Sequence, residues 1–137
     1  MHYKVTREGK YWLAEFADAP GCQTFAGSRA ELQVMAHEAL DGWLRSWLIT
    51  GETPPVPKAR RGNGFRVSVS SDLATAIQLR RAREAAHLTQ AELARRAGVS
   101  QQQIAKLEKP GENPTIGTLA KIAKALGRNV DVVFTAA

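Results

Sequence analysis

The sequence predicts an α+β protein, in which a small antiparallel sheet with one long helix precedes an all-helical domain. Residues 2 to 26 alternate between apolar and polar side chains, as strands do, whereas residues 71 to 127 follow helical spacing. Paired capping residues and glycines mark where the helices begin and end. We therefore expect two domains, at residues 1–70 and 71–137.

The charge is unevenly distributed along the chain. Residues 1–57 hold five basic and seven acidic side chains, a net charge of −2. Residues 58–137 carry a net charge of +8, so the whole chain carries +6. A basic half attached to a mildly acidic half indicates two modules with different partners: a polyanion for the basic one, and a basic or neutral partner for the acidic one.

The first domain begins with strand signals. Tyr3 and Val5 alternate with polar neighbours, and a turn at residues 8–10 leads to a second apolar run, which predicts a hairpin. A second turn at residues 19–21 precedes a third strand over residues 22–26, which include β-branched and aromatic side chains.

A long helix follows these strands. Ser28 and Glu31 have the spacing of a capping box, and Gly51 stops the helix before two prolines prevent its resumption. One face is expected to be apolar: Leu32, Met35, Ala36, Ala39, Leu40, Trp43, Trp47 and Leu48. The two tryptophans are expected to pack on the sheet, with one ring as an alternative anchor for a partner.

Residues 52–64 are expected to be partly linker, because they contain three prolines, a basic cluster and two glycines. Phe65, Val67 and Val69 then alternate with polar residues, which predicts a strand that returns to the first sheet. Ser71 or Asp72 is expected to cap the next helix.

Residues 89–108 predict two helices joined by a tight turn. Thr89 with Glu92, and Ser100 with Gln103, are two further capping boxes. Between them Gly98 can adopt the positive φ that ends the first helix at no steric cost.

The second of these helices has two chemically different faces. Ile104 and Leu107 are expected to face a core completed by Leu93, Ala94 and Val99. Its opposite face carries the candidate base-reading residues Ser100, Gln101, Gln102 and Lys106. Gln pairs with adenine in the major groove, so this face is suited to reading duplex DNA. Three further residues are placed to hold phosphates: Gln90, at the start of the first of these two helices, and Lys109 and Asn113, in the loop after the second.

Residues 79–127 resemble the DNA-binding domains of phage repressors and their bacterial relatives, a five-helix family built around a helix-turn-helix. The resemblance is carried by Thr89, Gln90, Glu92, Leu93, Ala94, Gly98, Val99, Ser100, Gln101, Ile104 and Glu108. It implies that Gln90 binds a phosphate and that Arg83 and Glu108 form a buried ion pair. His87 stands where many members have glycine, so we expect mild backbone strain there.

The first domain resembles the HicB antitoxin family. The resemblance rests on a succession of features: Asp18-Ala19-Pro20-Gly21-Cys22, then Phe25, the long helix, and Gly51-Glu52-Thr53-Pro54-Pro55-Val56-Pro57. It implies a degraded ribonuclease H-like fold. It also implies a protein that neutralises a small mRNA-cleaving HicA-type toxin through its N-terminal domain and represses its own operon through its C-terminal domain. Glu15, Asp18 and Trp43 are the candidate toxin contacts.

The C-terminal residues predict a dimerisation strand. Val130, Val132 and Phe134 alternate with Asp131 and Val133 after an all-helical domain. A lone strand exposes an unpaired edge, so we expect it to pair with its copy in a homodimer or a higher even oligomer. Two recognition helices would then meet successive major grooves; the alternative is that this segment packs on its own domain.

Other features exclude several classes of function. The sequence has no apolar run long enough to span a bilayer and no secretory signal pattern, so we expect a cytoplasmic protein. Cys22 is the only cysteine and is expected to be structural. The helix containing His37 and Glu38 lacks the second histidine of a zinc protease, so we expect no metal and no cofactor.

Two other functions remain open from the residues. The first is a ligand-sensing helix-turn-helix regulator without a toxin partner. The second is a nuclease that uses Glu15, Asp18 and Asp41 as metal ligands, which we disfavour because such chemistry needs several converging carboxylates. We therefore expect a protein that is not an enzyme.

Overall fold

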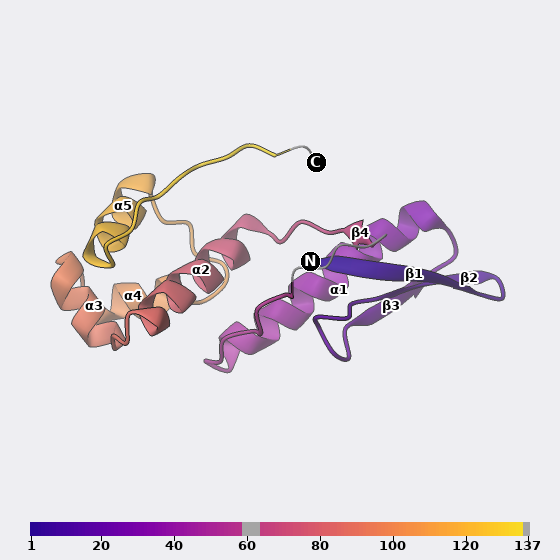
Figure 1. The fold of residues 1–137 in the computed structure, drawn as a ribbon, viewed down its shortest axis with the longest axis horizontal. Helices are drawn as coiled ribbons and strands as arrows, with labels where there is room; N and C mark the ends of the chain where they lie inside the picture. The colour runs from indigo at the N-terminus through magenta and orange to yellow at the C-terminus, as the bar shows by residue number, and fades with distance from the viewer. Residues whose placement is uncertain (59–63, 136–137) are drawn as a thin grey trace. The chain divides into compact units, whose positions relative to one another are not determined.

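The computed structural model describes residues 1–58 and 64–135, and the chain forms two compact units, Met1–Ser70 and Ser71–Ala137 (Figure 1). The first unit combines a sheet with one helix, and the second contains only helices. The α+β class predicted from the sequence is confirmed. Among the described residues, no helix is long and apolar enough to cross a membrane.

The sheet of the first unit has four antiparallel strands in the order β3-β2-β1-β4. These strands are β1 (His2–Glu8), β2 (Tyr11–Glu15), β3 (Gln23–Ala26) and β4 (Phe65–Arg66). The predicted hairpin is confirmed, with Gly9 at a φ of 59° in its turn. The predicted return of the chain after the linker is also confirmed, although β4 is shorter than expected and Val67 adds one backbone hydrogen bond to Met1.

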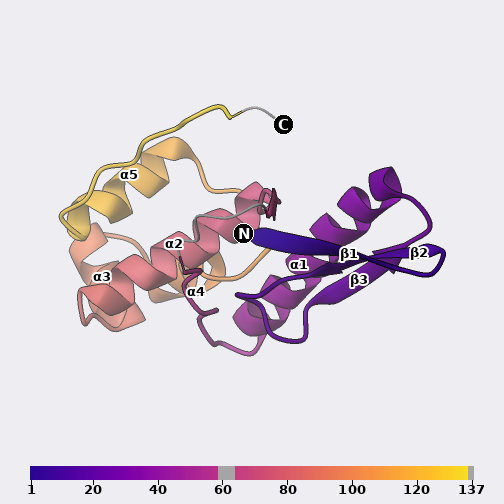
Figure 2. The ribbon, with the colours of Figure 1, turned by 45° about the vertical axis from the view of Figure 1, so that its right-hand side comes forward.

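Helix α1 (Arg29–Ile49) packs along the sheet, as Figures 1 and 2 show. The Ser28 hydroxyl caps it by accepting the Glu31 N–H, as the capping box predicted. Its buried residues recur every four positions: Leu32, Ala36, Leu40, Leu44 and Leu48. Trp43 and Trp47 are half-buried and contact each other edge to face, whereas Met35 is exposed and does not belong to the buried face as expected.

α1 also fixes the chain that leaves the sheet. The His37 Nδ1 lies 2.9 Å from the Ser68 carbonyl oxygen, and the Asp41 carboxylate accepts hydrogen bonds from the Ser70 hydroxyl and backbone N–H. These contacts hold residues 68–70 against the helix. The end of the first unit is therefore anchored up to the residue at which the next helix begins.

The second unit contains α2 (Ser71–Ala85), α3 (Gln90–Ala97), α4 (Gln101–Leu107) and α5 (Ile116–Ala125). Its described residues thus form four helices, where the repressor resemblance implied five. The stretch that carries the resemblance, residues 79–127, contains only α2 to α5, and residues 128–135 add no further helix. The predicted cap at Ser71 or Asp72 is wrong, because a cap precedes its helix and both residues lie within α2.

The C-terminal segment does not form the predicted strand within this single chain. Residues 128–135 have neither helical nor strand structure, and the side chains of Val132, Val133 and Phe134 are exposed, Phe134 by 97%. The physical reason is that a strand needs a hydrogen-bonding neighbour, and the described part of this unit supplies only helices. Val132, Val133 and Phe134 therefore do not pack on their own domain, whereas Val130 is half-buried.

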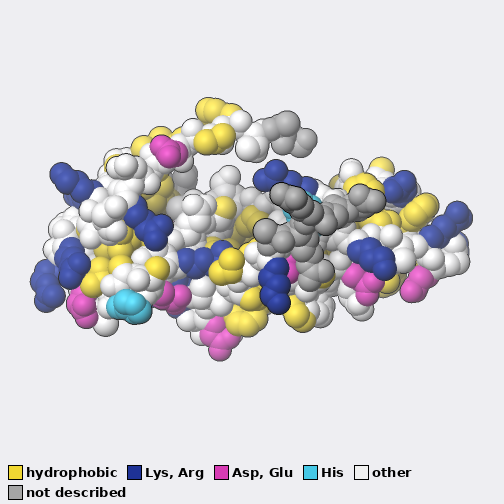
Figure 3. Space-filling model, in the orientation of Figure 1, with side chains coloured by type: hydrophobic (Ala, Val, Ile, Leu, Met, Phe, Trp, Pro, Cys, Tyr) yellow, Lys and Arg dark blue, Asp and Glu magenta, His cyan; other side chains and the backbone are white. Residues whose placement is uncertain are grey.

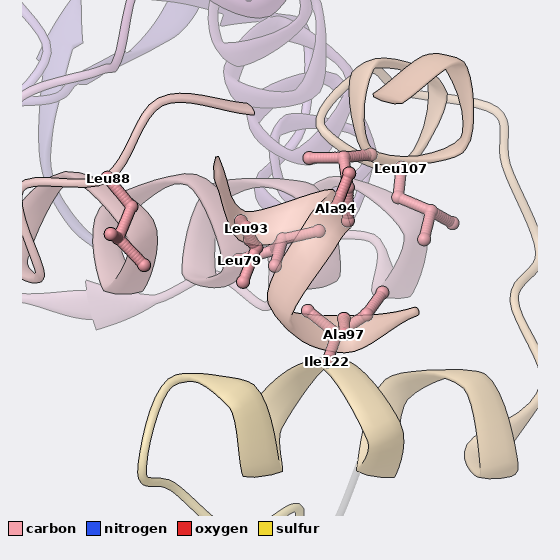
Figure 4. Packing of buried hydrophobic residues seen from close by; sticks show 8 residues of the cluster. Leu79, Leu88, Leu93, Ala94, Ala97, Leu107 and Ile122 are labelled. Atoms are coloured by element: carbon pink, nitrogen blue, oxygen red, sulfur yellow. The ribbon is translucent and has the colours of Figure 1, made fainter. Parts of the chain in front are cut away.

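The core of the second unit lies between α2, α3, α4 and α5 (Figure 4). It consists of Leu79, Leu88, Leu93, Ala94, Ala97, Ile104, Leu107 and Ile122, with Val99 packed at its edge. α3 contacts both α4 and α5, and the helical spacing of these apolar residues accounts for that arrangement. The predicted core of the two-helix segment is confirmed.

His87 has a φ of 55°, the left-handed conformation expected at a position where related sequences carry glycine. That conformation costs a residue with a Cβ about 1–2 kcal/mol. Glycine avoids this cost, but its greater flexibility in the unfolded chain offsets part of the gain. We predict that His87→Gly raises the free energy of unfolding by about 0.5–1 kcal/mol, measured by urea denaturation. Gly98→Ala, at a φ of 68°, serves as the control and should lower it. A loss of stability in His87→Gly would contradict this account.

Candidate nucleic-acid interface

The segment from Thr89 to Glu108 is held by its two caps and the turn between them. The Thr89 hydroxyl accepts the Glu92 N–H at 3.1 Å, and the Ser100 hydroxyl accepts the Gln103 N–H at 3.1 Å. Gly98 has a φ of 68°, and its backbone N–H donates to the carbonyl oxygens of Ala94 and Arg95 in the last turn of α3. Both predicted helix starts and the predicted glycine turn are confirmed, so local sequence determines where α4 begins.

α4 presents two faces of opposite chemistry. Ile104 is fully buried and Leu107 almost so, because both pack into the core of the unit. Gln101, Gln102 and Lys106 are exposed on the other face. This face offers amides and one cation to solvent, and carries no carboxylate that would repel phosphates.

Ser100 lies at the start of this face and is exposed. Its oxygen is engaged as the cap of α4, since it accepts the Gln103 N–H. The hydroxyl hydrogen stays available to donate to an acceptor on a base edge or a phosphate. Ser100 can therefore cap the helix and contact DNA at the same time.

A buried carboxylate at the end of α4 ties the two-helix segment to α2. Glu108 is 1% exposed and accepts two hydrogen bonds from the Arg83 guanidinium, with Nε to Oε1 at 2.5 Å and Nη2 to Oε2 at 3.0 Å. This hydrogen bonding raises the pKa of Arg83, although its burial opposes the rise. The ion pair implied by the repressor resemblance is confirmed.

Gln90, the candidate phosphate contact at the start of α3, is bound to the same carboxylate. Its Nε2 donates to Glu108 Oε2 at 2.9 Å, and the side chain is half-buried. An amide nitrogen carries two hydrogens, so this bond leaves one of them to donate. The network through Glu108 therefore fixes the position of the Gln90 amide before any ligand arrives.

Lys109 and Asn113 lie in the loop after α4, and both are exposed. The loop turns at Gly111, which has a φ of 91°. The Asp72 carboxylate of α2 accepts the Gly111 N–H at 2.9 Å and so fixes the loop. Sequence reasoning missed this role of Asp72, because the two residues are 39 positions apart and no local pattern connects them.

Basic side chains are frequent on the surface of the second unit. Figure 3 shows Lys and Arg side chains over the region where α3 and α5 lie in Figure 1. The exposed basic residues of these helices and of α4 are Arg95, Arg96, Lys106, Lys121 and Lys124. A positive surface of this kind attracts a polyanion over several ångströms.

The candidate toxin contacts lie around one turn of the first unit. Glu15 ends β2 and is exposed, and Asp18 is half-buried in the turn that follows. The Trp43 indole N–H donates to the Pro20 carbonyl oxygen at 3.3 Å, which brings α1 to the same turn. Residues far apart in the sequence are therefore gathered at one place.

The same turn carries little chemistry. Asp41 is engaged with Ser70 and lies 3.9 Å from Arg45, so it does not converge with Glu15 and Asp18 in a shared site. Within the described residues, no group of three or more His, Cys, Asp or Glu side chains could hold a metal ion. Cys22 is buried, and burial raises the pKa of its thiol, as expected for a structural cysteine.

We predict that Arg83→Met destabilises the second unit by about 3–5 kcal/mol, because it leaves the buried Glu108 carboxylate without its main partner. Urea unfolding measures this loss. The double variant Arg83→Met with Glu108→Leu removes both charges and should recover most of the stability. Equal stabilities of the single variant and the wild-type protein would show that the ion pair does not support the fold.

Comparison with known proteins places this geometry in context. The helix-turn-helix family matches residues 79–133. Over 98% of its length the chain is 30% identical to Antitoxin HicB of Escherichia coli strain K12, of which the match covers 99%. It is also 31% identical to Antitoxin HicB 1 of Photorhabdus laumondii, over 95% of this chain and 84% of the relative. The protein therefore belongs to the HicB antitoxin family and carries a helix-turn-helix DNA-binding domain in its second unit.

Proposed function

We propose that this protein is a cytoplasmic antitoxin that neutralises a small HicA-type mRNA-cleaving toxin through its first unit and represses its own operon through its second. Membership of the HicB family supports the antitoxin role. The observation that carries the DNA-binding role is the division of α4, where buried Ile104 and Leu107 leave Gln101 and Gln102 exposed.

In the proposed DNA complex, α4 enters the major groove. Gln101 and Gln102 donate and accept hydrogen bonds at adenine edges, while Ser100 and Lys106 contact neighbouring bases. Phosphate contacts set the position of the helix, and the candidates are Gln90, Lys109 and Asn113. The Glu108 and Asp72 contacts fix Gln90 and the loop in advance, so binding DNA requires little reordering of these groups.

A near-palindromic operator requires two copies of this surface. We propose that Val130, Val132 and Phe134 form the dimerisation strand by pairing with the same segment of a second chain. The exposure of Val132 and Phe134 supports this proposal, since exposed apolar side chains without a partner are costly in water; Val130 is half-buried. Two recognition helices on a dyad would meet half-sites about 34 Å apart.

Neutralisation of the toxin needs only binding. A toxin that cleaves RNA must bind a polyanion and therefore has a basic surface. Residues 1–57 carry a net charge of −2 and can attract such a surface and cover it, although the basic residues of 58–70 bring the whole first unit to a net charge of +2. Glu15, Asp18 and Trp43 are proposed as contacts beside the turn that joins β2 to β3.

We predict that Gln101→Ala or Gln102→Ala weakens binding to the protein's own promoter by about 1–3 kcal/mol while leaving binding to random duplex nearly unchanged. The physical reason is that the amides read bases, whereas phosphate contacts supply the non-specific affinity. Fluorescence anisotropy at fixed salt measures both. Gln33→Ala, an exposed glutamine of the first unit, is the matched control. Equal losses on both duplexes would show that these side chains do not read sequence.

We predict that the full-length chain copurifies with the product of an adjoining short reading frame that encodes a small basic ribonuclease, and that the complex no longer cleaves mRNA. Coexpression with a tagged copy of that product, followed by a cleavage assay, tests this. Purification of the chain with a bound metabolite and without such a protein would instead favour the ligand-sensing regulator.

A further inference from the structure

The middle of α1 contains a glycine that the fold of this chain does not explain. Gly42 lies within the 21-residue helix, where glycine is about 1 kcal/mol less favourable than alanine. A Cβ built at this position would have no atom within 4 Å, and its φ is not in the left-handed region. Neither packing nor backbone conformation within the described chain therefore requires glycine here.

Exposed apolar side chains lie on the same face of the helix. Helical periodicity places Met35 and Ile49 about two turns on either side of Gly42, with Val34 at the border of this face. Val34 is 59% exposed and Ile49 67% exposed. The sheet packs on the opposite side of α1, against the leucines, so these side chains gain nothing from the core.

The charges on this face are mostly negative. Glu31 and Glu38 are both exposed, and neither forms a salt bridge within the described residues. The nearby Arg45 lies 3.9 Å from the Asp41 carboxylate, so its charge is largely compensated. The face therefore combines apolar contact area with the carboxylates of Glu38 and Glu31 around a position without a side chain. The Glu31 Oε2 also accepts the Gly27 N–H at 3.0 Å.

We propose that this outer face of α1, defined by Glu31, Val34, Met35, Glu38, Gly42 and Ile49, is a docking surface for the toxin in addition to the contacts proposed at Glu15, Asp18 and Trp43. The inference rests on the proposed function and names the contact that the function requires. The RNA-binding surface of the toxin is basic and complements Glu31 and Glu38. Val34, Met35 and Ile49 supply apolar contacts, and the bare backbone at Gly42 lets the partner approach the helix closely.

The second unit of another copy of this chain is the main competing occupant, because it is also basic, with a net charge of +4 over residues 71–137. The two occupants differ in what a substitution at Gly42 changes. If the toxin docks here, the substitution affects binding of the toxin and leaves the mass of the isolated antitoxin unchanged. If a second copy docks here, the mass of the isolated protein falls.

The test uses full-length Gly42→Ala and Gly42→Gln. Because alanine is the better helix former, Gly42→Ala should raise Tm by about 4–8 °C, which shows that the variant folds. Gly42→Gln adds a long side chain at the point of closest approach and should weaken toxin binding by roughly 10-fold or more, measured by calorimetry. Unchanged toxin affinity in Gly42→Gln, or a lower oligomer mass without toxin, overturns the proposal.

The charged residues give a second readout. Glu38→Lys should slow association with the toxin, and the loss should shrink as salt is added. Glu8→Lys makes the same charge change at an exposed residue at the end of β1. It should slow association less, because Glu8 lies outside the docking face. Equal effects would show that only net charge matters and would overturn the assignment to α1. Failure of the wild-type chain to bind the toxin at all would instead reject the proposed function, and this inference with it.

Discussion

The second unit depends on the burial of Ile104 and Leu107 in the core between α2, α3 and α5. These two side chains set the rotation of α4 about its own axis, and this rotation decides which residues face solvent. With Gly98 ending α3 and Ser100 starting α4, the helix also has a fixed origin. Gln101 and Gln102 are therefore exposed as a consequence of the packing of the other side, and not through any contact of their own.

A single helix performs several tasks in the first unit. The leucine face of α1 holds the sheet, and His37 and Asp41 on a neighbouring face fix the chain before Ser71. Its remaining face is the proposed docking surface. In the second unit Glu108 has a comparable role, because it joins α2, α3 and α4 through Arg83 and Gln90. In each unit, buried contacts hold the scaffold and the proposed recognition residues lie on the faces that these contacts leave open.

The sequence predicts well those features that local chemistry determines. The caps at Ser28, Thr89 and Ser100 involve residues three positions apart, so their spacing alone identified the helix starts. Contacts between distant residues could not be predicted from the sequence. The hydrogen bond between the Asp72 carboxylate and the Gly111 N–H, for example, joins segments that no periodicity relates. The alternation from Val130 to Phe134 does not by itself decide the structure, for a different reason. Such a pattern shows that a segment suits a strand, but the ladder partner decides whether the strand forms.

The central claim, that the exposed face of α4 reads duplex DNA, can be tested most directly by NMR of the glutamine side-chain amides in the full-length protein. Titration with the promoter duplex should shift the NH₂ signals of Gln101 and Gln102 and leave that of Gln33 in place, with assignments made from the corresponding alanine variants. If the signals of Gln101 and Gln102 stay unchanged when the duplex is bound at saturation, DNA contacts another surface and the account of α4 is wrong.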